Sequence, residues 1–227
     1  MPDPGLASRP VLLVGATGLV GRQVVARHRQ GDGRLVALAR QSLAGSADAV
    51  EADPADWPAV IARIAPHAVI CALGTTWRKA GRGEAAFRAV DHHLVLGVAR
   101  AARAAGTGHF VLVSATGAER RARGFYLRVK GEVEAALGET GFRRLDILRP
   151  GLLRGRRGGE RRVLEQLAIA VSPFTDRLLP AAWRSIDAGD VAAAALAVLR
   201  EAGEGCLIHD NAAMLHLARP SSAGTRQ

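Results

Sequence analysis

Short apolar runs recur along the chain and alternate with longer segments of helical spacing. The runs, of four to six residues, are Val11–Val14, Leu35–Ala39, Ala68–Leu73, Phe110–Val113 and Leu145–Leu148, with a weaker strand pattern at Asp48–Glu51 and a last strand at Cys206–His209. Apolar and alanine positions at helical spacing occupy Leu19–Gln30, Trp57–Ile64, Glu84–Ala105, Gly124–Glu139, Val163–Val171 and Val191–Glu201. This alternation predicts an α/β fold, a doubly wound and mostly parallel Rossmann sheet of about seven strands with helices on both faces.

The length of 227 residues fits one α/β domain, because sheet-and-helix folds of this size commonly stay undivided. We therefore expect residues 1–227 to form a single domain. Within it, residues 152–187 are expected to make a small substrate-side segment. Residues 1–9 and 220–227 are expected to be disordered because of their composition.

No stretch approaches the roughly 20 uninterrupted apolar residues that span a bilayer, so no membrane partner is expected. The opening residues also lack the apolar core of a signal peptide, which predicts a cytoplasmic location. Cys71 and Cys206 lie inside apolar runs, as small buried hydrophobic residues do, rather than in a disulfide framework. No metal-ligand spacing occurs, and no metal is expected.

The formal net charge of +10 is typical of proteins that bind an anionic partner, but the distribution of the charge along the chain argues against this interpretation. Of the 31 basic residues 29 are arginine, scattered along the chain, with one dense run from Arg154 to Arg162. No aromatic residues are interleaved with the arginines of that run, and no nucleic-acid-binding signature appears. Specific nucleic-acid binding is therefore not expected, and most of the charge is assigned to a solvated surface.

The first predicted strand runs directly into a glycine turn, GATGLVG, at residues 15–21. A helix begins there, so that backbone amides and the helix dipole can meet a pyrophosphate. Gly15 would make the tight turn, Gly18 would let the backbone approach phosphate, and Gly21 would let the helix pack closely on the sheet. The alternative is a tight but empty turn. We predict a nicotinamide dinucleotide at Gly15, Thr17, Gly18, Leu19, Val20 and Gly21.

The choice between the two nicotinamide dinucleotides is made about 20 residues further on, where an acid would hold the ribose of NAD and an arginine the 2′-phosphate of NADP. The second predicted strand ends in Arg40, with no acid beside it, and Arg22 stands at the start of the first helix. These residues favour NADP(H). Asp53, after the third strand, either accepts a hydrogen bond from the adenine amino group or caps the helix ahead of Trp57.

The single tyrosine of the chain, Tyr126, lies four residues before Lys130, one of only two lysines. On a helix this spacing puts both side chains on one face, so that an ammonium can lower the pKa of the phenol and also reach the nicotinamide ribose. A phenol tuned in this way can give or take a proton as hydride moves. The alternative is an incidental pair on a surface helix.

Hydroxyl and small residues follow three other predicted strands, where ligands of such sheets bind. After the fifth strand, Ser114 is the first candidate to bind a substrate oxygen and Thr116 the second. Either hydroxyl can instead satisfy backbone groups at the strand end. The predicted cofactor site is completed by residues after the fourth and sixth strands, namely Leu73, Gly74, Thr75 and Pro150.

Taken together, these stretches resemble the Tat-interacting protein 2 oxidoreductase family of atypical short-chain dehydrogenases, from about Val11 to Asn211. The most particular segments are CALGTTWRKAG (71–81), VDHHLVL (90–96), HFVLVSATGA (109–118), FYLRVKGEVE (125–134) and LRPGLL (148–153). The resemblance implies a Rossmann fold, NADPH binding and a catalytic set at Ser114, Tyr126 and Lys130. It also implies that Lys79 belongs to a loop that faces the cofactor or the substrate.

Two positions depart from the wider superfamily. Short-chain dehydrogenases usually carry two consecutive hydroxyl residues after the fifth strand, the second being catalytic, and here the second is Ala115. Asp91 stands where an asparagine usually supports a proton-relay water. Its carboxylate either performs that role with an altered pKa or pairs with a nearby arginine on the helix face.

These observations support an NADP(H)-dependent carbonyl reductase or alcohol dehydrogenase. Tyr126 would be the general acid/base, Lys130 would tune it and hold the ribose, and Ser114 would orient the oxygen of a small carbonyl or alcohol substrate. The rival hypothesis, favoured by Ala115, is an NADPH-binding regulatory protein that acts through protein partners. Four side chains are either substrate lining or core: Phe174, Leu178, Leu179 and Trp183.

Overall fold

The computed structural model describes residues 9–29, 33–41, 48–75, 81, 83–155 and 180–219. Seven strands in this part of the chain form one sheet in the order β3-β2-β1-β4-β5-β6-β9. Each neighbouring pair is parallel. The strands are β1 (Val11–Val14), β2 (Leu35–Ala39), β3 (Ala49–Glu51), β4 (Ala68–Cys71), β5 (His109–Val113), β6 (Arg144–Leu148) and β9 (Gly205–His209). The predicted doubly wound Rossmann sheet is confirmed.

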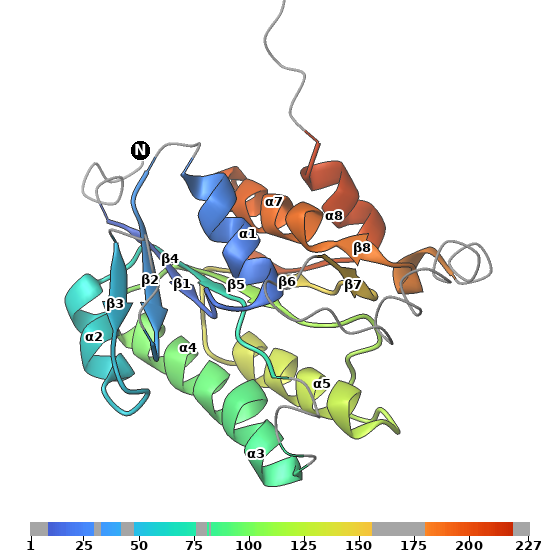
Figure 1. Ribbon diagram of the computed structural model, residues 1–227, viewed down its shortest axis with the longest axis horizontal. Helices are drawn as coiled ribbons and strands as arrows, with labels where there is room; N and C mark the ends of the chain where they lie inside the picture. The colour runs from blue at the N-terminus through green and yellow to red at the C-terminus, as the bar shows by residue number, and fades with distance from the viewer. Residues whose placement is uncertain are drawn as a thin grey trace, which may run out of the picture.

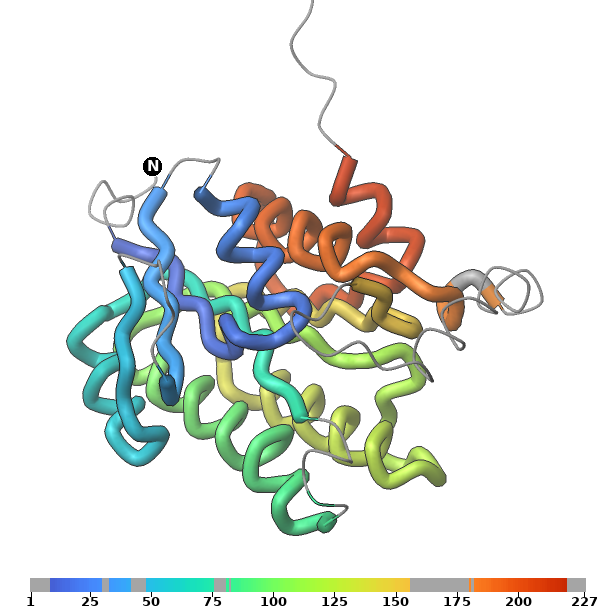
Figure 2. The backbone as a smooth tube through the Cα atoms, in the orientation of Figure 1, coloured from blue at the N-terminus to red at the C-terminus, as the bar shows by residue number. Residues whose placement is uncertain are grey.

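Helices cover both faces of this sheet (Figure 1). One face carries α2 (Trp57–Ile64), α4 (Val95–Ala104) and α5 (Phe125–Gly138), and the other carries α1 (Leu19–His28), α7 (Ala188–Ala197) and α8 (Asn211–Leu217). Although far apart in sequence, α1 and α7 pack side by side (Figure 2). The remaining short elements are α3 (Glu84–Arg88), η1 (Ala89–Leu94), η2 (Ala181–Trp183), η3 (Val198–Arg200) and a two-stranded sheet of β7 (Leu153–Arg154) and β8 (Ile186–Asp187).

The alternating side chains of each strand supply two separate cores. On β5, Phe110 and Leu112 pack into the cluster beneath α2, α4 and α5, whereas Val111 and Val113 pack into the cluster beneath α1, α7 and α8. Strands that are buried on both faces need apolar residues at successive positions, which explains the continuous apolar runs of the sequence. The order of strands reverses between β1 and β4, so the carboxyl ends of these two strands border the usual ligand crevice of such sheets.

Several boundaries differ from the sequence prediction. The expected helix over Glu84–Ala105 is observed as three consecutive helical segments, α3, η1 and α4, of which η1 is a π-helix. The short strands β7 and β8 and the helix α8 were not predicted. The expected helix at Val163–Val171 lies outside the described residues, as do residues 1–8 and 220–227, and the single-domain prediction is not tested. No helix of the described part combines the length and apolar character that crossing a membrane requires.

Candidate functional site

The glycine turn between β1 and α1 is packed so tightly that two of its glycines have no room for a side chain. Gly15 has a φ of +87°, and a Cβ on it would lie 2.4 Å from the carbonyl oxygen of Ala72. A Cβ on Gly21 would lie 2.1 Å from the carbonyl oxygen of Gly15. The structure thus gives a physical reason for these two glycines, a left-handed turn and a helix that touches it.

The third glycine, Gly18, has a different environment. A Cβ on it would meet only the carbonyl oxygens of Gly15, at 3.1 Å, and Ala72, at 3.7 Å. Gly18 is the N-cap of α1 and, having no side chain, gives the first-turn amides of that helix no capping hydrogen bond. Because these amides have no partner within the helix and carry the positive end of its dipole, the turn suits an anionic group such as a phosphate. Thr17, Leu19 and Val20 complete this end of the helix.

Arg40 and Asp53 lie at the ends of the next two strands. Arg40 directly follows β2 and is exposed, with no acidic partner among the described residues. Asp53 is also exposed, and its Oδ1 accepts a hydrogen bond from the amide of Ala55 at 2.9 Å, in a turn ahead of α2. The N-cap residue of α2 is Asp56 rather than Asp53. The helix-cap alternative for Asp53 is therefore wrong, and its contact with the adenine amino group stays a prediction.

The loop after β4 meets a buried ion pair. The Nζ of Lys130 lies 2.8 Å from Oδ1 of Asp91, and Oδ2 of Asp91 accepts a hydrogen bond of 2.7 Å from the amide of Thr75. Gly74 lies against this pair, because a Cβ on it would be 3.6 Å from Oδ1 of Asp91 and 4.0 Å from Nζ of Lys130. Among the described residues Asp91 therefore pairs with the predicted catalytic lysine and not with an arginine, and Gly74 and Thr75 lie beside this pair. Cofactor binding by Leu73, Gly74 and Thr75 stays a prediction.

The ionisation of this pair follows from its surroundings. Burial by itself lowers the pKa of Lys130, but the carboxylate of Asp91 and the nearby Tyr126 outweigh it, so that the pKa is raised. Burial raises the pKa of the neighbouring Cys71 thiol to about 11, which keeps that thiol neutral at physiological pH. The site therefore contains a charged ammonium that is almost completely shielded from water.

Tyr126 lies one helical turn before Lys130 on α5 and is 43% exposed. Its ring packs edge-on against Phe87 of α3, with ring centroids 5.7 Å apart. The ring is thus held by a neighbour while a large part of the side chain faces solvent. The predicted placement of Tyr126 and Lys130 on one helix is observed, with the lysine buried and the tyrosine accessible.

Ser114 is occupied by a contact that the sequence did not predict. Its hydroxyl donates a hydrogen bond of 2.5 Å to Glu134 on α5, and both residues are buried. Glu134 also pairs with Arg149, whose Nη2 lies 2.5 Å from Oε2. With its proton directed to Glu134, Ser114 keeps only lone pairs for another partner. In this conformation it can accept a hydrogen bond from an alcohol but cannot donate one to a carbonyl.

The second hydroxyl candidate, Thr116, is also engaged, because it lies 2.9 Å from the carbonyl oxygens of both Arg149 and Ala182. The carbonyl of Pro150 accepts a hydrogen bond from the amide of Thr116. Trp183 is half-exposed, and its ring lies against Gly117, at the same end of β5. Other residues predicted near this site, Lys79, Phe174, Leu178 and Leu179, lie outside the described residues.

A second buried polar cluster, which the sequence reasoning missed, lies between β5, β6 and β9. Asp146 is fully buried. Its carboxylate oxygens lie 2.6 Å from Nε2 of His109, 2.7 Å from Nε2 of His209 and 2.7 Å from Nε of Arg144. Burial raises the pKa of Asp146, but the hydrogen bonds from these three partners lower it by more, and it is held far below its ordinary value. A carboxylate inside an otherwise apolar strand was the available signal in the sequence. Because this cluster is internally satisfied, we assign it to stability.

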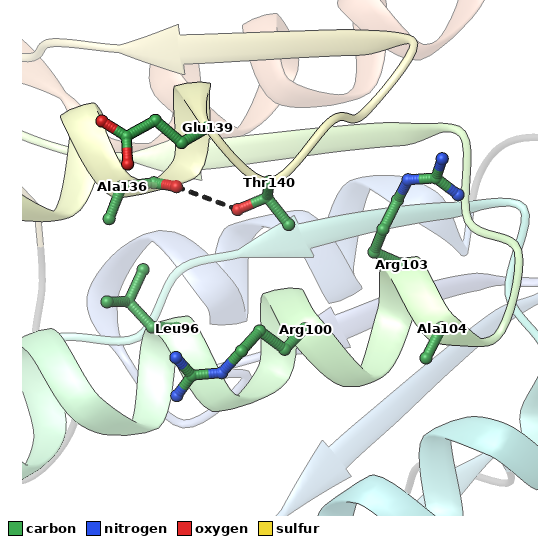
Figure 3. Close-up of a pocket in the computed structure, with 7 residues that line it drawn as sticks. All are labelled: Leu96, Arg100, Arg103, Ala104, Ala136, Glu139 and Thr140. Carbon is green, nitrogen blue, oxygen red and sulfur yellow. Dashed lines mark hydrogen bonds between the residues drawn. The ribbon is translucent and has the colours of Figure 1, made fainter.

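A surface groove with a volume of about 590 Å³ lies between α4 and α5 (Figure 3). Its lining consists of Leu96, Arg100, Arg103, Ala104, Ala136, Glu139 and Thr140. Most of these residues belong to the C-terminal halves of the two helices, and α4 leads into the start of β5. The groove therefore lies toward the amino edge of the sheet, away from the glycine turn and the Lys130 pair.

Comparisons with known proteins agree with this geometry. The sequence profile of a family described as NAD(P)H-binding matches residues 15–202. The Fmp52 protein of Aspergillus clavatus is 33% identical over 210 residues, which cover 86% of this chain and 88% of that protein. Protein HTATIP2 of Rattus norvegicus is 41% identical over 155 residues, 66% of this chain and 61% of that protein. These relatives confirm the resemblance to the Tat-interacting protein 2 family.

Solved structures show the same fold at low sequence identity. The ligand-free aldohexose dehydrogenase AldT of Thermoplasma acidophilum has a TM-score of 0.67 and 16% identity, and the match covers 97% of this chain and 99% of that one. At this identity the likeness shows the fold alone.

The relatives correct the expected location. Fmp52 proteins are named as mitochondrial, which contradicts the prediction of a cytoplasmic location. The prediction rested on the lack of an apolar secretory core. That criterion does not address mitochondrial import, because transit segments are amphipathic and arginine-rich rather than apolar.

Proposed function

The chain belongs to the NAD(P)H-binding family, and from this premise we propose that it is an NADP(H)-dependent oxidoreductase of the atypical short-chain dehydrogenase type. Its substrate would be a small carbonyl compound or the corresponding alcohol. The observation that carries the proposal is the pairing on α5 of an accessible Tyr126 with a buried, charged Lys130 beside the loop after β4.

The described residues fit a dinucleotide. The uncapped first turn of α1 suits the pyrophosphate, and Gly18 leaves the space that a side chain would fill. The exposed guanidinium of Arg40 supports a preference for the 2′-phosphate of NADP(H), because a guanidinium binds phosphate oxygens in a bidentate way. When bound, the dinucleotide supplies or accepts the hydride.

The protein groups would handle the proton. We assign Tyr126 as the general acid in reduction and the general base in oxidation. The Lys130 ammonium would stabilise the phenolate form and hold the nicotinamide ribose. Ser114 would orient the substrate oxygen, and its bond to Glu134 suits it to accept from the hydroxyl of an alcohol. For a carbonyl substrate the Ser114 hydroxyl would have to turn away from Glu134.

One observation favours a second candidate function, an NADPH-binding regulatory protein with little turnover that acts on a protein partner. At the end of β5, position 115 is alanine, and the hydroxyls of Ser114 and Thr116 are both engaged by protein acceptors. A binding-only protein needs no free hydroxyl there, whereas a reductase that follows the usual pattern does.

Turnover of NADPH with a panel of aldehydes, ketones and quinones separates the two functions. The Tyr126→Phe variant keeps the ring that packs on Phe87 and removes only the proton donor, so we expect turnover to fall by roughly 10² to 10⁴ with little change in NADPH affinity. Equal rates in wild type and variant would refute the role of Tyr126. NADPH binding without oxidation by any compound of the panel would favour the regulatory protein.

A further inference from the structure

Asp91 lies in a π-helical segment, and this departure from regular α-helix places its side chain beside Lys130. It lies in η1, a π-helical turn between α3 and α4, and it is only 1% exposed. A π-helical turn widens the helix by one residue and is often found at functional sites. The position is not an ordinary helix-surface carboxylate, and burying it would be unfavourable unless its charge were compensated.

The compensation comes from two other elements. Oδ2 of Asp91 accepts a hydrogen bond from the amide of Thr75, and Oδ1 lies at ion-pair distance from Lys130. The contact of Oδ1 with the lysine, at 2.8 Å, joins two opposite charges that are both buried. One carboxylate thereby ties the loop after β4 to the lysine of α5.

The lysine, in turn, has few alternatives to Asp91. The Lys130 side chain is 5% exposed. Within the described residues, the ionisable groups that influence it are Asp91 from η1, Tyr126 from its own helix and the Cys71 thiol from β4. The raised pKa of Cys71 keeps that thiol neutral. In the described part of the chain, Asp91 is therefore the carboxylate that compensates the buried ammonium.

We propose that Asp91 is a positioning residue that holds the Lys130 ammonium beneath Gly74 and keeps it charged before any dinucleotide binds. This role differs from support of a relay water, because Asp91 acts through the lysine. The consequence for dinucleotide affinity rests on the proposed function, whereas the effect on the lysine itself does not.

The composition of the chain allows a direct test, because Lys130 and Lys79 are its only lysines. In a Lys79→Arg background, NMR of lysine labelled with ¹³C at Cε reports Lys130 alone. We expect Lys130 to titrate above its ordinary pKa of about 10.4, and Asp91→Asn to lower that pKa by about 2 units. The control Asp190→Asn removes a carboxylate from α7, on the other face of the sheet, and should leave the pKa of Lys130 unchanged.

A fall of less than one unit in the Asp91→Asn variant would overturn the proposal. If that variant does not fold, the Lys79→Arg protein still decides the matter, since a Lys130 pKa at or below the ordinary value would also overturn it. A merely structural role for Asp91 would change stability without moving the titration of a lysine in the folded protein.

Dinucleotide binding supplies the functional readout. Between pH 7 and pH 9.5 the NADPH affinity of the wild type should stay nearly constant, whereas that of Asp91→Asn should weaken progressively as Lys130 loses its proton. A pH dependence equal to that of the wild type would contradict the inferred role of Asp91. Failure of both proteins to bind NADPH would refute the proposed function instead, while the NMR result would still decide the role of Asp91.

Discussion

Replacing Gly21 by alanine tests whether the glycine turn is packed as described. The new Cβ would lie 2.1 Å from the carbonyl oxygen of Gly15 and 2.8 Å from both the carbonyl carbon of Gly15 and the Cα of Ala16. All three are backbone atoms, which cannot rotate away, and so the turn and α1 must separate by more than about 1 Å to reach ordinary contact distance. Strain of this kind destabilises a core by about 1–3 kcal/mol.

The matched control is Gly97→Ala in α4, where a Cβ meets nothing within 4 Å. Alanine is favoured over glycine inside a helix by about 1 kcal/mol, and this variant should therefore be neutral or stabilised. Gly21 also lies inside a helix, so this gain is common to both variants, and their free energies of unfolding should differ by the strain alone, about 1–3 kcal/mol. Urea unfolding followed by circular dichroism measures this difference. Equal urea midpoints for the two variants would show that the turn is not packed in this way.

Two further perturbations test the cofactor preference and the buried cluster around Asp146. Arg40→Asp should reduce the ratio of NADPH affinity to NADH affinity at least about tenfold, or about 1.4 kcal/mol, because a carboxylate would repel the 2′-phosphate. Parallel fluorescence titrations measure this ratio, and an unchanged ratio would show that Arg40 does not contact the 2′-phosphate. Asp146→Asn should lower the free energy of unfolding by about 3 kcal/mol, since it removes the buried carboxylate partner of Arg144 and leaves it the half-exposed Glu201. Because the folded-state pKa of Asp146 is depressed, its ionisation contributes fully above the unfolded-state pKa of about 3.9 and less as the pH falls below it. The thermal unfolding temperature should therefore change less between pH 6 and pH 3 in Asp146→Asn than in the wild type. The same pH dependence in both proteins would contradict a stabilising role for ionised Asp146.

The sequence predicted the centre of the fold well because the strands buried on both faces need apolar runs and the turn after β1 has a recognisable glycine pattern. The runs at Val11–Val14 and Leu35–Ala39 coincide with β1 and β2, and the glycine turn joins a strand to a helix as expected. The helix α8 was missed because it is short and only Met214 and Asn211 are buried in it, although Asp210 does cap it through the amide of Ala213.

The partners of the polar residues could not be predicted in the same way. Ser114 and Glu134 are 20 residues apart, and His209 is 63 residues from Asp146. Spacing on one element does not determine which side chains meet across helices and strands. The pair of Tyr126 and Lys130 was predictable because both lie on one helix, whereas the pairing of Asp91 with Lys130 depends on a π-helical turn that apolar periodicity does not reveal.

A calorimetric titration of NADPH into wild type and Gly18→Ala tests the central claim most directly. A Cβ on Gly18 would lie 3.1 Å from its nearest neighbour, the Gly15 carbonyl oxygen, and so a small adjustment should let this variant fold. We predict one saturable site in the wild type and an affinity at least about tenfold weaker in Gly18→Ala, because the methyl group obstructs the approach of phosphate to the turn. Equal affinities in two folded proteins, or no binding by the wild type, would contradict a dinucleotide site at the glycine turn.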